Sequence, residues 1–256
     1  MSITAVADRR VALRPLALPN EHGGWGFLFE PIVLAGIAAP SLAGMLVALA
    51  AVAAFLARHP LKLAAADVVR GRRYPRTAAC ATIATAYSLV ALIAIVCAAY
   101  AHVRLLLPLA IAAPFGLVQL AYDAKNRGRA ALPELAGAIA MGGVAASMAL
   151  AASLPLALAG ALWLLALCRS LPAILYVRAI LGRGRGAVAA HVIAVAVAAL
   201  LWRAKLAPFV AVIAAAVLLA RSLHRPAMPV AKRVGVAELL WGGAATIATG
   251  LGYLLR

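Results

Sequence analysis

Long apolar runs separated by short polar segments constrain this chain more than any other feature of its sequence. Nine such runs, each of 15 to 25 residues, follow one another between residues 25 and 255. A bilayer core about 30 Å thick is crossed by about 20 residues of α-helix. The runs are Trp25–Ala39, Ser41–Ala57, Thr77–Ala101, Leu105–Ala121, Ala130–Ala152, Leu154–Tyr176, Gly186–Trp202, Leu206–Ala220 and Val234–Leu255. The chain is therefore predicted to be an all-α, polytopic membrane protein with about nine transmembrane helices.

The composition excludes the main soluble classes of protein. Of the 256 residues, 66% are hydrophobic and 12% are charged, whereas about a quarter of the residues in a soluble domain are charged. A chain with so few charged residues cannot cover a water-facing surface, which excludes a soluble enzyme and a disordered protein. We expect residues 1–24 to form a cytoplasmic or interfacial arm and residues 25–256 to form a single transmembrane domain.

The distribution of basic residues predicts the orientation of the helices. The net charge is +17, and 19 of the 24 Lys and Arg residues fall in the N-terminal segment or in segments 58–76, 122–129, 177–185 and 221–233. Basic loops of membrane proteins stay on the cytoplasmic side. We therefore expect a multi-pass protein of the cytoplasmic (inner) membrane, with its N-terminus inside and its C-terminus outside. The same rule explains the basic charge without a nucleic-acid partner.

Several charged residues fall inside the predicted helices. Glu30 and Glu134 lie near the starts of the first and fifth, and Arg169 lies inside the sixth. A charged group at the centre of a bilayer costs roughly 2.5–3.5 kcal/mol, so these side chains should face the bundle interior. One arrangement is a set of ion pairs, such as Arg169 with Glu30 or Glu134. The other is a pocket open to the cytoplasm and lined by Glu21, His22, Glu30, Asp67, Asp123, Glu134 and Arg169.

Four clusters of polar and aromatic residues carry a family resemblance. They are Pro19-Asn-Glu-His-Gly-Gly-Trp25, Pro75-Arg-Thr77, Tyr122-Asp-Ala-Lys-Asn-Arg-Gly-Arg129 and Ser170-Leu-Pro-Ala-Ile-Leu-Tyr-Val-Arg178. Together they resemble the YwiC-like family of bacterial membrane proteins, over nearly the whole chain. The first cluster is the most specific of the four.

The chain is also similar, more distantly, to the UbiA superfamily of intramembrane prenyltransferases. Those enzymes have nine helices and join an isoprenoid diphosphate to an acceptor. The stretch Pro75-Arg-Thr77 and the residues Tyr122, Lys125 and Arg127 are placed like similar residues in that superfamily. The resemblance implies a UbiA-like bundle that binds a membrane lipid or isoprenoid.

The chain differs from the UbiA superfamily at the residues that bind metal there. UbiA proteins carry two aspartate-rich motifs, after the second and sixth helices, which hold Mg²⁺ against the diphosphate. Here segment 58–76 offers only Asp67, and segment 176–185 contains no acid. Because Mg²⁺ needs several oxygen ligands, we expect no metal cofactor and direct binding of an anion by Arg and Lys.

Three functions remain open at this stage. The first is a divergent prenyltransferase, or another protein that acts on an isoprenoid or lipid with an anionic head group. Its expected catalytic residues are Glu21, His22, Glu30 and Asp67. Its expected substrate-binding residues are Arg58, His59, Lys62, Arg70, Arg76, Tyr122, Asp123, Lys125, Asn126, Arg127, Glu134, Arg169, Tyr176 and Arg178. The second is a non-catalytic quinone- or lipid-binding subunit with a partner in a membrane complex, and the third is a small-anion transporter.

Overall fold

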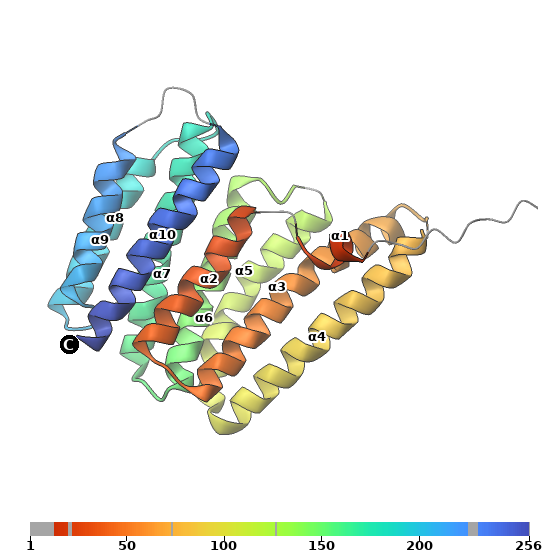
Figure 1. Cartoon of the computed structure of the whole chain (residues 1–256), viewed down its shortest axis with the longest axis horizontal. Helices are drawn as coiled ribbons and strands as arrows, with labels where there is room; N and C mark the ends of the chain where they lie inside the picture. The colour runs from red at the N-terminus through yellow and green to blue at the C-terminus, as the bar shows by residue number, and fades with distance from the viewer. Residues whose placement is uncertain (1–12, 20–21, 73, 126, 225–229, 256) are drawn as a thin grey trace, which may run out of the picture.

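The computed structural model describes residues 13–19, 22–72, 74–125, 127–224 and 230–255 (Figure 1). Every regular element in these ranges is a helix, which confirms the predicted all-α class. The helices are α1 (Arg14–Ala17), α2 (His22–Ala38), α3 (Leu42–Val69), α4 (Pro75–Ala101), the 3-10 helix η1 (Val103–Leu105), α5 (Leu106–Ala124), α6 (Ala131–Ala151), α7 (Leu156–Ile180), α8 (Ala187–Arg203), α9 (Phe209–Ser222) and α10 (Ala231–Leu254).

Each predicted apolar run corresponds to one helix from α2 to α10. Six of these helices are long and apolar enough to cross a membrane: α3, α4, α5 together with η1, α6, α7 and α10. The other three, α2, α8 and α9, are apolar but shorter. These findings support a multi-pass membrane protein, while the UbiA-like arrangement of its helices stays a prediction.

Several helices continue past the ends predicted for them. α3 was expected to end at Ala57 but runs to Val69, so that Arg58, Pro60 and Lys62 are helical. Arg and Lys are good helix formers, so their charge ends an apolar run without ending the helix. The next helix, α4, starts with Pro75 at its first position, where a missing N–H is harmless, and the backbone N–H of Tyr74 donates to Thr77 Oγ1 at 3.0 Å.

α6 lies at the centre of the bundle and packs against α2, α3, α5 and α7. Nearly all of its second half is buried, and those residues are mostly alanine and glycine. Small side chains let helices approach closely in a membrane. α7 then packs on α8, α8 on α9, α9 on α10, and α10 returns to α2. Helices far apart in sequence therefore surround one interior.

α4 and α1 lie at the periphery of the bundle (Figure 1). α4 packs mainly against α3 and exposes large apolar side chains such as Leu92, Ile93 and Val96. Such a surface suits contact with lipid tails. α1 packs on α3 and α4, where His59 Nε2 lies 3.1 Å from the Pro15 carbonyl oxygen and the Tyr87 hydroxyl donates to the Ala17 carbonyl at 3.4 Å.

Successive connections alternate between the two ends of the bundle. One end carries the α3–α4, α5–α6, α7–α8 and α9–α10 connections, which contain the basic segments. We call it the basic end; it lies toward the top and right of Figure 1. The opposite end carries the α2–α3, α4–α5, α6–α7 and α8–α9 connections and the end of α10.

Candidate functional site

Four charged side chains from four helices meet inside the bundle. Arg169 of α7 donates from Nη2 to Glu30 Oε1 of α2 at 3.2 Å, to the Glu238 carbonyl of α10 at 2.8 Å and to Glu238 Oε2 at 3.4 Å. Arg221 of α9 forms a second ion pair with Glu238 Oε1. We call Glu30, Arg169, Arg221 and Glu238 the buried charge cluster. Their side chains are between 10% and 16% exposed.

Charge balance and close packing both explain why this cluster can exist in a membrane. Two guanidiniums face two carboxylates, so the group as a whole is neutral, as buried charges require. Gly242 makes the approach possible, because a Cβ atom there would overlap Glu30 Oε1 and Arg169 Nη2. Arg221 also lies over two rings, 4.7 Å from the Tyr176 centroid and 5.6 Å from the Trp241 centroid.

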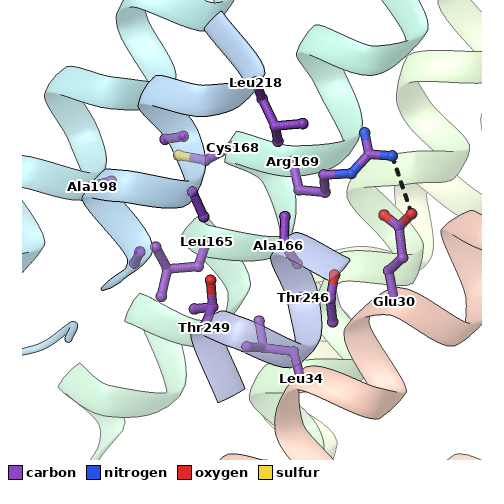
Figure 2. Close-up of a pocket in the computed structure, with 14 residues that line it drawn as sticks. Glu30, Leu34, Leu165, Ala166, Cys168, Arg169, Ala198, Leu218, Thr246 and Thr249 are labelled. Atoms are coloured by element: carbon purple, nitrogen blue, oxygen red, sulfur yellow. Dashed lines mark hydrogen bonds and ion pairs between the residues drawn. The ribbon is translucent and has the colours of Figure 1, made fainter. Parts of the chain in front are cut away.

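A cavity of about 40 Å³ lies beside the buried charge cluster (Figure 2). Its polar lining consists of Glu30, Cys168, Arg169, Thr246 and Thr249, and its remaining walls are alanine and leucine. Three buried atoms of the cluster have no hydrogen-bond partner among the described residues: Glu30 Oε2, Arg169 Nε and Glu238 Oε1. Glu238 Oε1 is in an ion pair with Arg221, whereas Glu30 Oε2 and Arg169 Nε both belong to residues that line the cavity. A cavity needs about 10–15 Å³ of this kind of volume for each water. The site therefore has room for a few waters or one small ion.

The acids expected around a single pocket are instead divided among separate interhelical contacts. Asp67 binds Arg76 at 2.7 Å and accepts a hydrogen bond from Thr77 at 2.9 Å, and it is fully buried. Asp123 pairs with Arg58. These contacts form because α3 and α5 extend beyond their predicted ends and bring charged side chains within reach of neighbouring helices.

Glu134 also has a partner different from the one expected. Arg178 donates from Nη1 to Glu134 Oε2 at 2.8 Å and to the Arg129 carbonyl at 3.2 Å. Of the two alternatives for Arg169, the ion pair with Glu30 is therefore the one that forms. Among the described members of the expected pocket, Glu30 and Arg169 line the cavity beside the buried charge cluster, and Asp67, Asp123 and Glu134 do not.

The remaining predicted site residues lie at the basic end or near it. Tyr176 donates from its hydroxyl to the His224 carbonyl at 3.2 Å. Arg127 lies 6.0 Å from the Tyr122 ring centroid. Lys62, Arg70 and Lys125 form no ion pair within the described ranges. Glu21, Asn126 and the side chain of His22 lie outside the part of the chain that the structure describes.

The basic end also contains a tightly covered carboxylate. Asp123 is 3% exposed, and a Cβ atom at Gly128 would overlap its Oδ1 atom. The backbone N–H of Arg127 donates to the Tyr122 carbonyl at 2.9 Å, which folds the α5–α6 connection back over Asp123. We call Lys62, Lys125 and Arg127 the α3–α5 basic cluster. Lys62 lies one helical turn after Arg58, and Lys125 and Arg127 closely follow Asp123, which is the ion-pair partner of Arg58.

The carboxylates do not fit the magnesium site that the UbiA resemblance implies. Asp67 is bound by Arg76 and Thr77, and the connection after α7, residues 181–186, has no acid. Within the described residues there is no group of three or more His, Cys, Asp or Glu side chains that could hold a metal ion.

The match to a family model covers the first of the four motifs and the helices that follow it. The model of the family described as "YwiC-like protein" matches residues 18–149. The chain belongs to the YwiC-like family. No curated protein and no solved structure matches it. The matched region of this YwiC-like protein spans α2 to α6 and supplies Glu30, whereas Arg169, Arg221 and Glu238 follow it.

Sequence reasoning left two members of the buried charge cluster out of the site. Glu238 lies in the last apolar run, and Arg221 lies in the basic segment 221–233, so neither was predicted to belong to the site. For Glu238 a usable signal was present, because Glu238, Gly242 and Thr246 follow one another at intervals of four residues, a spacing that places side chains on one helix face. The YwiC-like protein thus has two chemically different groups of charged residues: a neutral buried charge cluster beside a small cavity, and an excess of cations at the basic end.

Proposed function

We propose that this YwiC-like protein binds the anionic head group of a membrane lipid or isoprenoid at the α3–α5 basic cluster, without a divalent metal. The observation that carries the proposal is that arginines already pair with Asp67, Asp123 and Glu134. Lys62, Lys125 and Arg127 have no described carboxylate within ion-pair distance, and their charge is open to an anion from outside the protein.

The position of the cluster at the end of membrane helices favours a lipid head group. Lys62 lies about two turns before the end of α3, and Lys125 and Arg127 lie within three residues after the end of α5. Lys and Arg near an anionic bilayer surface each contribute about 1 kcal/mol. The isoprenoid or acyl tail would lie along the apolar outer faces of the helices, because the cavity of about 40 Å³ is too small for it.

The proposal includes an orientation. The basic end faces the cytoplasm, because the basic segments gather there and basic loops resist translocation. The head group is then taken from the inner leaflet of the cytoplasmic membrane. Arginine can hold a phosphate through two parallel hydrogen bonds, so magnesium is not needed to neutralise it.

Native mass spectrometry of the protein in neutral detergent tests this function. The probes are phosphatidylglycerol, an isoprenyl diphosphate and inorganic diphosphate, each with and without EDTA. We expect the two amphiphiles to bind in EDTA and to dissociate as salt is raised. If inorganic diphosphate binds and the two amphiphiles do not, the site recognises free phosphate and not a lipid head group. Binding that vanishes with EDTA and returns with Mg²⁺ would contradict the metal-free site.

A matched pair of triple variants separates this site from general attraction to basic charge. The test variant carries Lys62→Gln, Lys125→Gln and Arg127→Gln. The control variant carries Arg183→Gln, Arg185→Gln and Lys232→Gln, which removes the same charge elsewhere on the basic end. At about 1 kcal/mol per cation, the test variant should bind amphiphiles at least about tenfold more weakly, and the control should change affinity by about twofold or less. Equal losses would contradict the proposal.

A further inference from the structure

The buried charge cluster is built from helices other than those that carry the α3–α5 basic cluster. Of its three polar atoms without a hydrogen-bond partner among the described residues, Glu238 Oε1 is in an ion pair with Arg221, and the other two belong to residues that line the cavity. Glu30 Oε2 can accept a hydrogen bond and Arg169 Nε–H can donate one, and both residues line the cavity (Figure 2). Arg169 is nine-tenths buried. We infer that this cluster is a binding site for one proton and one small monovalent anion, which enter together. The site is independent of head-group binding at the basic end.

Contacts within the cluster identify Glu30 as the carboxylate that takes the proton. Glu238 is held between two guanidiniums, with Oε2 at 3.4 Å from Arg169 Nη2 and Oε1 paired with Arg221. Glu30 has one guanidinium contact, through Oε1, and its Oε2 atom is left without a partner. The proton adds to Oε2, turns the carboxylate into a carboxylic acid and leaves a neutral acceptor facing Arg169.

Charge balance then requires the anion. With both carboxylates ionised, the cluster has two positive and two negative groups; once Glu30 is protonated it carries one net positive charge. An uncompensated charge in a region of low dielectric is very costly. A monovalent anion beside Arg169 Nε–H restores neutrality without moving a helix. The threonine hydroxyls that line the cavity, Thr246 and Thr249, can donate further hydrogen bonds.

The size of the cavity selects the class of anion. A volume of about 40 Å³ corresponds to about three waters, which suits an ion as small as chloride, nitrate or formate. A phosphate ester or gluconate is too large. The apolar walls, including Leu34, Leu165 and Leu218, give a multivalent ion no compensation for its second charge.

The charged and titratable groups near Glu30 come from α7, α8, α9 and α10. α7 contributes Arg169 and the Cys168 thiol, α9 contributes Arg221, and α10 contributes Glu238. His191 of α8 points its Nδ1 at the Ala187 carbonyl at 2.8 Å and faces the Tyr176 ring edge-on. α3 and α6, which also pack on α2, contribute no residue to the cavity lining.

Labelling with dicyclohexylcarbodiimide tests the proton site. This apolar reagent adds a protonated carboxylic acid across its C=N bond, and the resulting O-acylisourea rearranges to a stable N-acylurea that mass spectrometry locates. For protein in detergent, we expect labelling at Glu30 that declines as pH rises and is absent in Glu30→Gln. Glu134 is the internal control, because it is 33% exposed and pairs with Arg178 at the basic end. No labelling of Glu30 at any pH that leaves the protein folded would overturn the proton site.

The anion is tested by its effect on the same reaction at constant ionic strength. Proton and anion must each raise the affinity for the other. Replacing gluconate by nitrate, chloride or formate should therefore raise the labelling of Glu30 by about fivefold or more at the alkaline side of its pH profile. The increase should saturate with anion concentration, and the labelling of Glu134 should not change. In weakly buffered solution, nitrate should also cause uptake of protons by the protein. Identical profiles in nitrate and gluconate, without proton uptake, would overturn the joint site.

A cavity variant shows where the anion sits. Thr246→Val removes a hydroxyl from the lining but keeps the shape of the side chain, and it leaves every ion pair of the cluster in place. We expect Thr246→Val to keep pH-dependent labelling of Glu30 and to need several-fold more nitrate for the same stimulation. The matched control is Thr82→Val on α4, whose hydroxyl donates to the Ala78 carbonyl on an exposed surface. An unchanged nitrate requirement in Thr246→Val would place the anion outside this cavity.

Discussion

A single methyl group at residue 242 should separate the charges that hold the interior together. In Gly242→Ala the new Cβ atom occupies the space of Glu30 Oε1 and Arg169 Nη2. Overpacking of this kind costs about 1–3 kcal/mol when neighbours can adjust. Breaking a buried ion pair costs about 3–5 kcal/mol, because each charge is left uncompensated. Alanine offsets about 1 kcal/mol of this through its helix propensity. We therefore expect a net loss of about 2–4 kcal/mol in the free energy of unfolding if the pair breaks.

The next residue provides the matched control for that prediction. A Cβ atom at Gly243 meets nothing within 4 Å, so Gly243→Ala should leave stability unchanged or raise it by up to about 1 kcal/mol. Thermal unfolding in mild detergent, followed by tryptophan fluorescence, compares the two variants. A Gly242→Ala protein as stable as Gly243→Ala would show that the buried charge cluster does not have the geometry described.

Three further predictions concern the basic end and the topology. Gly128→Ala should destabilise the protein, because its Cβ atom would overlap Asp123 Oδ1. Gly235→Ala is the control, because a Cβ atom there meets nothing within 4 Å, and equal stabilities of the two variants in the same unfolding assay would refute this prediction. Asp67→Asn should destabilise the start of α4, because Arg76 and Thr77 both donate to that carboxylate. Amide hydrogen exchange at residues 75–80 should become faster, and an unchanged exchange rate would contradict this prediction. Cysteines introduced at Arg127 and Arg203 in whole cells should react with impermeant reagents from opposite sides, and reaction of both from one side would contradict the orientation.

Most of the fold could be predicted because it depends on the length of apolar runs. Each run that the sequence separates, from Trp25–Ala39 to Val234–Leu255, becomes a helix. The boundaries were less predictable. Apolarity indicates where lipid ends, but a helix continues for as long as its backbone hydrogen bonds do, so Arg58 and Lys62 belong to α3.

The site could be predicted only in part, because its pairings depend on which helices are neighbours. A lone Arg169 in an apolar helix had to find an acid, and Glu30 was one of two candidates. Nothing in the sequence pattern indicates that α9 and α10 lie beside α7, so Arg221 could not be assigned to Glu238. The same holds for the three outer ion pairs, in which Asp67, Asp123 and Glu134 have arginine partners chosen by packing.

The buried charge cluster also has a consequence for how the chain is made. Glu30 is synthesised 139 residues before Arg169, and ribosomes add about 5–20 residues per second, so its partner arrives about 7–28 s later. During that interval α2, which is short for a membrane span, would hold a carboxylate in lipid without a counter-charge. α2 must therefore wait near the membrane surface, or with Glu30 protonated, until α7 emerges. The final position of α2 is set by a helix from the second half of the chain.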